Sequence, residues 1–188
     1  MFRDWKEAAD IRRKKRWLPI AALAACAVAW KFGISGETAA AALAEFHGAG
    51  RRLEYKGSFH GADVYDDYAH HPNELHALLQ AVRLMHYRRV ICAFQPHTYS
   101  RTKALFQSFV DELRTADQVV LADIYAAREQ NTVGVSSQEL AAEIPGAVYC
   151  PSLQGVTAYL RENAQPGDII LTVGAGDIYK AGEALFTE

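Results

Sequence analysis

The sequence predicts an α/β domain with a mostly parallel sheet that is covered by helices on both faces. From residue 72 onward, short apolar segments alternate with longer segments of helical periodicity. Alternation of this kind is typical of parallel sheets whose strands are joined by helices. The apolar segments are almost continuous in valine, isoleucine and leucine, with no polar residue at every second position, as expected for strands buried on both faces.

The expected elements follow one another in a regular order. Helices are predicted over residues 72–85, 101–116, 136–144, 153–163 and 176–186, and strands over residues 89–94, 118–124, 147–150 and 168–173. Residues 51–66 precede them as two extended segments rich in β-forming residues. This order corresponds to a Rossmann-like arrangement, in which ligands bind at the carboxyl ends of the strands.

A shorter helical region precedes the α/β domain. Residues 19–31 are rich in alanine and begin at Pro19, which suits a first helical turn, and Gly33 suits a helix end. A second alanine-rich helix is expected over residues 37–46. Glycines at positions 48 and 50 interrupt the helical pattern. We therefore place a boundary there, which separates residues 1–49 from an α/β domain of residues 50–188.

Charge is unevenly distributed along the chain. Of the 20 basic and 22 acidic residues, 7 and 3 lie within residues 1–16, which leaves 13 and 19 in the rest. The body is therefore acidic and does not attract nucleic acid by bulk electrostatics. The basic run of residues 12–16 could form only a weak, non-specific site for nucleic acid. We therefore expect no nucleic-acid partner.

The beginning of the chain also resembles an export signal. Its basic run precedes an apolar stretch, and residues 23–26 match a lipoprotein cleavage box with Cys26 as the lipidated residue. Against this, Pro19 interrupts the apolar stretch, which also continues through Cys26 to Trp30. A packing helix is therefore favoured over a lipid anchor at Cys26. The stretch is shorter than the ~20 apolar residues that cross a bilayer, so we expect a cytoplasmic chain without a membrane partner.

Polar side chains cluster directly after the second extended segment. Two acids, a tyrosine and two histidines precede the helix that begins near Pro72, and among them are Asp67, Tyr68, His70 and His71. Asp67 could simply cap the helix, and His70 could be a solvated turn residue. The two adjacent histidines also suggest a metal site. Adjacent side chains on a turn point in different directions, however, which disfavours binding of one metal ion by both. The density of polar groups at a strand end favours a functional site.

A second group follows the strand of residues 89–94. His97, Arg101 and Lys103 lie where the next helix begins. Cationic donors beside a helix N-terminus favour an anion, and the planar arginine fork suits a carboxylate or a phosphate. The alternative is an ordinary solvated face of the helix.

Two further loops lie at the same predicted edge. A long polar loop of residues 125–131 follows the strand of residues 118–124. The last strand is followed by Gly174-Ala175-Gly176, where glycine permits close backbone approach, although a plain tight turn is equally consistent. The chain contains no G-x-x-x-x-G-K-[ST] loop and therefore no cradle for a triphosphate.

Four segments together resemble the C-terminal domain of the Mur ligase family. They are DDYAHHPNEL (66–75), FQPHTYSRTKALF (94–106), LADIYAAREQN (121–131) and TVGAGDIYK (172–180). The HHP and FQPH forms are similar to the branch of the family that adds L-alanine, and the resemblance spans roughly residues 18–188. The basic residues 1–16 do not resemble the family, an HN-x-x-N segment is absent, and Thr98 stands where arginine is frequent.

The resemblance implies a reaction and a set of binding residues. Family members use ATP and Mg²⁺ to activate the carboxylate of UDP-N-acetylmuramate, and the amine of L-alanine then attacks. By position, Arg52 and Asp67 correspond to nucleotide-contacting residues, and Tyr68, His97 and Arg101 to residues that hold the amino acid. His70 lies beside them and is included in the L-alanine site. No catalytic residue and no metal ligand is assigned.

The resemblance also implies that essential parts of the enzyme lie elsewhere. The family's P-loop and UDP-sugar domains have no counterpart here, so residues 18–46 correspond to a two-helix remnant of the central ATP-binding domain. We therefore expect a truncated chain that is inactive alone, binds no cofactor tightly, and could self-associate through residues 18–46. The alternatives are a non-catalytic binding or scaffold module of the same fold and a lipoprotein domain anchored at Cys26.

Overall fold

The computed structural model describes residues 22–46 and 49–187. The chain divides into two compact units, one up to Ala49 and one from Gly50 onward. The predicted basic head of residues 1–16, together with Pro19, lies outside the described residues. Among the residues that are described, no helix is both long and apolar enough to span a bilayer.

The first unit contains two helices joined by a turn. Residues 22–31 are helical, and Gly33 adopts a left-handed backbone (φ 76°) directly after them, as the sequence predicts. Helix α2 (Gly36–Ala44) begins at Ser35, whose hydroxyl accepts a hydrogen bond from the Thr38 amide. No residue of α2 is buried, and Trp30 is 82% exposed. An apolar groove of about 350 Å³ lies between the two helices and includes Cys26.

The second unit is built on a six-stranded sheet with the order β1-β2-β6-β3-β4-β5. Its strands are β1 (Glu54–Phe59), β2 (Ala62–Asp67), β3 (Arg89–Phe94), β4 (Gln118–Leu121), β5 (Val148–Tyr149) and β6 (Asp168–Val173). All neighbouring strands are parallel except β1 and β2, which form a hairpin. His60 and Gly61 form its two-residue turn, both with positive φ, which matches the twist of the strands.

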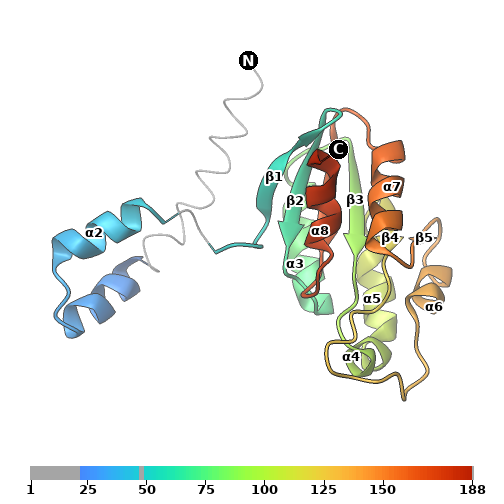
Figure 1. The fold of residues 1–188 in the computed structure, drawn as a ribbon, viewed down its shortest axis with the longest axis horizontal. Coiled ribbons are helices and arrows are strands. Elements are labelled where there is room, and N and C mark those ends of the chain that lie inside the picture. Colours follow the sequence, from blue (N-terminus) through green and yellow to red (C-terminus); the bar gives the residue numbers. More distant parts are fainter. Residues whose placement is uncertain (1–21, 47–48, 188) are drawn as a thin grey trace. The chain divides into compact units, whose positions relative to one another are not determined.

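Helices cover both faces of this sheet, which confirms the predicted fold class (Figure 1). They are α3 (Pro72–Arg83), α4 (Tyr99–Ala104), α5 (Phe106–Leu113), α6 (Ser137–Ala142), α7 (Leu153–Asn163) and α8 (Tyr179–Glu183), followed by a 3₁₀ turn at Ala184–Phe186. The side chains of α3, α5 and α6 pack on one face, and those of α7 and α8 pack on the other.

Two helices depart from their predicted bounds by more than two residues. The helix expected over residues 101–116 begins at Tyr99 and is interrupted at Leu105, where ψ is 19° and the chain turns into α5. Leu105 and Phe106, on either side of the interruption, are partly buried and pack against the core. The closing helix begins at Tyr179 instead of residue 176, because residues 174–178 form a turn.

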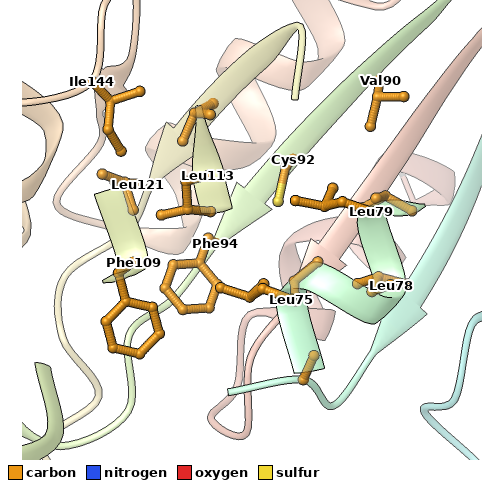
Figure 2. Close-up of a cluster of buried hydrophobic side chains, with 14 of the residues drawn as sticks. Leu75, Leu78, Leu79, Val90, Cys92, Phe94, Phe109, Leu113, Leu121 and Ile144 are labelled. Carbon is orange, nitrogen blue, oxygen red and sulfur yellow. The ribbon is translucent and has the colours of Figure 1, made fainter. Parts of the chain in front are cut away.

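The larger core lies between the sheet and helices α3 and α5. Figure 2 shows Leu75 and Leu79 of α3 facing Cys92 and Phe94 of β3, and the Phe94 ring lies 5.5 Å from that of Phe109. These side chains are at most 2% exposed. Each contributes roughly 1.5–3 kcal/mol of transfer free energy when fully buried. This rigid layer fixes the strands whose carboxyl ends carry the polar loops.

Candidate functional site

The polar loops that follow β2, β3 and β6 converge at one edge of the sheet. The imidazole rings of His70 and His97 lie 6.0 Å apart, although they follow different strands. The Gly174 amide donates to the Asp67 carbonyl (3.1 Å), and the Gln95 amide donates to the Val173 carbonyl (2.9 Å). The structure therefore places these loops together at the carboxyl ends of the strands, where ligands bind in this class of fold.

Asp67 is the buried acid at the end of β2. Its carboxylate accepts hydrogen bonds from the amides of Leu53 (2.7 Å) and Ala69 (2.8 Å). Burial raises the pKa of Asp67, and these two amides only partly oppose that shift. Asp67 therefore does not cap helix α3, and the capping alternative is wrong for this residue.

His71 caps helix α3 instead. Its ring accepts a hydrogen bond from the Asn73 amide (3.2 Å), while the Glu74 carboxylate accepts from the amides of His70 (2.9 Å) and His71 (3.2 Å). Pro72 occupies the first turn, as predicted. Histidine is not among the favoured N-cap residues, so its residue type does not predict this role.

The ring of His70 has a different environment from that of His71. Its Nδ1 lies 2.9 Å from the Tyr68 carbonyl oxygen, a distance at which Nδ1 carries the proton and donates. The rings of Tyr68 and His70 meet edge to face at 5.4 Å. The two histidines therefore serve separate partners, and no group of three metal-binding side chains occurs among the residues described.

The loop after β4 joins the site through His97. The Thr98 amide donates to the Tyr125 carbonyl (2.9 Å), and the Tyr125 amide donates to the Pro96 carbonyl (2.8 Å). The rings of His97 and Tyr125 stack at 5.5 Å with an angle of 19° between their planes. Thr98 has a φ of 70°, a strained conformation for a β-branched residue. Tyr125 thus belongs to the site, although sequence reasoning singled out only its loop.

Two buried polar atoms at this edge lack hydrogen-bond partners. Within the described part of the chain there are three such side-chain atoms, and two of them are His97 Nδ1 and Arg101 Nη1. Leaving a buried donor or acceptor unpaired costs roughly 1–3 kcal/mol, and more for a charged group. One atom precedes helix α4 and the other lies within it. Two such atoms so close in the chain are consistent with a site where a ligand supplies the missing hydrogen bonds, and the guanidinium favours an anionic group.

The electrostatic environment keeps His97 neutral. Burial lowers the pKa of His97 below its usual range, and the neighbouring charges of Arg101 and His70 lower it further. The unfolded chain therefore takes up this proton at a higher pH than the folded chain does. The contribution of His97 to stability is present above the unfolded pKa of about 6.5 and is lost as the pH falls below it.

We expect Arg101→Gln to raise the pKa of His97 part of the way back to its usual value. The substitution removes the cation but leaves the ring buried, so only one of the causes disappears. Titration of the His97 ring by NMR measures this directly. A pKa that is unchanged in Arg101→Gln would show that the guanidinium does not act on the ring.

The backbone of the turn after β6 lies close against the loops that follow β3 and β4. A Cβ atom added to Gly174 would lie 2.6 Å from the Gln95 carbonyl oxygen, and one added to Gly176 would lie 2.7 Å from the Tyr125 ring. The Gln95 amide group donates to Asp177 (3.0 Å) and accepts from the Ile178 amide (3.2 Å). The segment is a turn whose two glycines allow the close approach of the neighbouring loops, so the structure agrees with both interpretations.

Arg52 and Tyr68 form the exposed part of the site. Arg52 is exposed, and its guanidinium lies 5.7 Å from the centre of the Tyr68 ring. Tyr68 itself is 36% exposed. Ring contacts connect Arg52 to Tyr68, Tyr68 to His70, and His70 to His97. Asp67, the last residue of β2, and Arg101, in α4, lie at the same edge of the sheet.

Comparison with known proteins agrees with this geometry. Residues 51–176 match the glutamate ligase domain of the Mur ligases. The chain is 45% identical over 171 residues to UDP-N-acetylmuramate–L-alanine ligase of Caldanaerobacter subterraneus subsp. tengcongensis, an alignment that covers 89% of this chain and 37% of that protein. It is 48% identical over 167 residues to the corresponding ligase of Lachnospira eligens, with 87% and 36% covered.

A solved structure shows the same architecture. The crystal structure of UDP-N-acetylmuramate–alanine ligase from Thermotoga maritima matches with a TM-score of 0.61 and 26% identity, covering 87% of this chain and 35% of that one. The chain therefore spans little more than a third of the length of these relatives. Taken with the match of residues 51–176, these similarities establish that the chain belongs to the Mur ligase family.

Proposed function

We propose that residues 50–188 are the amino-acid-binding and site-closing domain of a UDP-N-acetylmuramate–L-alanine ligase. The observation that carries this proposal is the pair of unpartnered buried atoms, His97 Nδ1 and Arg101 Nη1, beside His70. An amino acid offers the two complementary groups. Its carboxylate suits the arginine fork, and its amine suits the unprotonated nitrogen of a neutral imidazole.

L-Alanine would bind between the loops that follow β2 and β3. Arg101 holds its carboxylate, His97 accepts a hydrogen bond from its amine, and Tyr68 and His70 close the other side. A neutral His97 suits this role, because a cationic ring would repel the ammonium form of the substrate. The side chain of alanine is a single methyl group, so the selectivity of the site comes from these charged and polar contacts.

The nucleotide would meet Arg52 and Asp67. The exposed guanidinium of Arg52 suits a phosphate, whereas the Asp67 carboxylate would repel one and suits the hydroxyl groups of the sugar. ATP transfers its γ-phosphoryl group to the muramate carboxylate, the alanine amine attacks the acyl phosphate, and phosphate leaves with loss of one amine proton. Mg²⁺ accompanies the ATP phosphates, and no residue of this chain is assigned to it.

The rest of the active site would come from the parts of the ligase that this chain does not span. Closure of the domain over them excludes water, which would otherwise hydrolyse the acyl phosphate. Because the substrates include ATP, we place the protein in the cytoplasm.

We interpret the first unit as a portion of the ATP-binding domain that precedes the C-terminal domain in the family. The alignment to the Caldanaerobacter ligase covers 89% of the chain, whereas residues 50–188 are about three quarters of it, so the similarity extends into residues before Gly50. Several large apolar side chains of residues 22–46 are exposed, among them Trp30 and Phe32. We propose that residues 18–46 mediate self-association, which analytical ultracentrifugation of the chain at several concentrations tests.

The isolated chain should bind amino acid weakly and catalyse no ligation. With ATP, Mg²⁺, UDP-N-acetylmuramate and L-alanine present, we expect no release of phosphate above the blank. In NMR spectra of the same chain, L-alanine should shift the signals of His97 and Arg101, and D-alanine should shift them less. Phosphate release by the chain alone would contradict the proposal that the rest of the active site lies in other parts of the ligase. An absence of L-alanine-dependent shifts would contradict the proposal that this chain binds L-alanine.

A further inference from the structure

The segment that begins the second unit holds Arg52 between two strained residues. Arg51 and Leu53 both have left-handed backbones, with φ of 56° and 45°. Neither is glycine, so both conformations are unfavourable in isolation and persist only because surrounding contacts enforce them. The contact at Leu53 is the hydrogen bond from its amide to the Asp67 carboxylate (2.7 Å).

The side chain of Arg51 supplies the contacts on the other side of Arg52. Its Nε donates to the buried Asp66 carboxylate (2.7 Å), which also accepts from the Thr172 hydroxyl (2.8 Å). Its Nη1 and Nη2 donate to the carbonyl oxygens of Gly176 (3.0 Å) and Gly174 (2.6 Å). One guanidinium therefore joins the end of β2 to the turn after β6.

Arg51 is also connected to Tyr68. Its guanidinium lies 5.0 Å from the centre of the Tyr68 ring and 4.8 Å from that of Tyr179. Its backbone carbonyl accepts a hydrogen bond from the Tyr68 amide (2.8 Å). The position of Tyr68 thus depends on Arg51 through both the ring and the backbone.

We propose that Arg51 is a positioning residue that fixes Arg52 and Tyr68 at the site edge. All five of its N–H directions lie in a rigid plane, so it can bond a carboxylate and two carbonyls while its face contacts aromatic rings. A lysine at this position keeps the charge but offers a single point of donation. Only the identity of the ligands that Arg52 and Tyr68 meet rests on the proposed function. The positioning itself is a property of the free chain.

Hydrogen exchange of the full chain, followed by NMR without ligand, tests the positioning. In Arg51→Lys we expect the Tyr68 amide to lose protection by roughly tenfold or more, because its acceptor is no longer held in place. The amide of Leu171, in the fully buried strand β6, should keep its protection. Asp66→Asn removes the partner of the same ion pair and should produce the same selective loss at Tyr68, which provides a second variant should Arg51→Lys fold poorly.

Arg161→Lys is the matched control. Arg161 also donates to two carbonyls, those of Ala184 and Thr187, but these lie near the C-terminus and away from the loops of the site (Figure 1). This variant should leave Tyr68 protection unchanged. Equal losses of amide protection at Tyr68 and Leu171 in Arg51→Lys would show that Arg51 supports the whole fold. Retained protection at Tyr68 would show that Arg51 does not hold Tyr68 in place. Either result overturns the proposal.

A titration with ADP then separates this proposal from the proposed function. If the wild-type chain binds ADP, Arg51→Lys should weaken binding by roughly tenfold through misplacement of Arg52, and unchanged affinity would overturn the proposal. If the wild-type chain does not bind ADP, as expected where the phosphate-binding loop lies in parts of the ligase that this chain does not span, the exchange measurement alone decides whether Arg51 positions Tyr68.

Discussion

Gly174→Ala should lower the free energy of unfolding by about 3 kcal/mol, the combined size of a strained backbone and a close steric contact. Gly174 has a φ of 149°, a region that L-residues rarely adopt, and the new Cβ would lie 2.6 Å from the Gln95 carbonyl oxygen. That oxygen belongs to the backbone at the end of β3 and cannot rotate away. Relief would require the two loops to separate, which would also disturb the bonds from Arg51.

Urea unfolding followed by circular dichroism measures this effect. Gly50→Ala is the matched control, since a Cβ there meets only the Glu54 carboxylate at 3.7 Å and the backbone φ is outside the left-handed region. We expect the control to stay within about 0.5 kcal/mol of the wild-type chain. Equal stability of the two variants would mean that the loops after β3 and β6 are not packed as described.

Arg101→Lys should raise the KM for L-alanine by roughly 10–100-fold in a complete ligase, with a smaller effect on kcat. The chain can be joined to the preceding part of one of its relatives for this purpose. The predicted size is that of a charge-assisted hydrogen-bond pair. Lysine keeps the positive charge but loses the fork that matches a carboxylate.

Lys103→Gln is the control for this experiment. Lys103 is exposed on the same helix, α4, two residues further along the chain. If Arg101 acts through its geometry, removing the charge of Lys103 should leave the KM nearly unchanged. A KM that responds to Lys103→Gln as strongly as to Arg101→Lys would indicate general charge attraction, and a KM unaffected by Arg101→Lys would remove this residue from the L-alanine site.

The order of the elements could be predicted because strands that are buried on both faces of a sheet consist of nearly continuous apolar residues. The predicted strands that correspond to β3 and β6 are nearly uninterrupted apolar runs. Every residue of β6 is buried in the structure. The loops of the site could be found for a related reason. In a parallel sheet the carboxyl ends of the strands share an edge, so the sequence alone predicts that Asp67 and His97 lie close together.

The remaining features depend on contacts that the sequence does not reveal. Arg51 bonds Gly174, 123 residues away, because β2 and β6 are neighbours in the sheet. Local patterns do not determine that strand order. Likewise, no break in the apolar pattern marks the interruption at Leu105. The helix cap at His71 uses a residue type that rarely caps.

The most direct test of the proposed function is ligation by the chain when it is joined to the preceding domains of a relative, such as the Thermotoga maritima ligase. We predict that the joined protein forms an amide from UDP-N-acetylmuramate and L-alanine with one ATP consumed per product, and that the separate chain does not. A joined protein that folds and binds ATP but forms no amide with L-alanine would contradict the account.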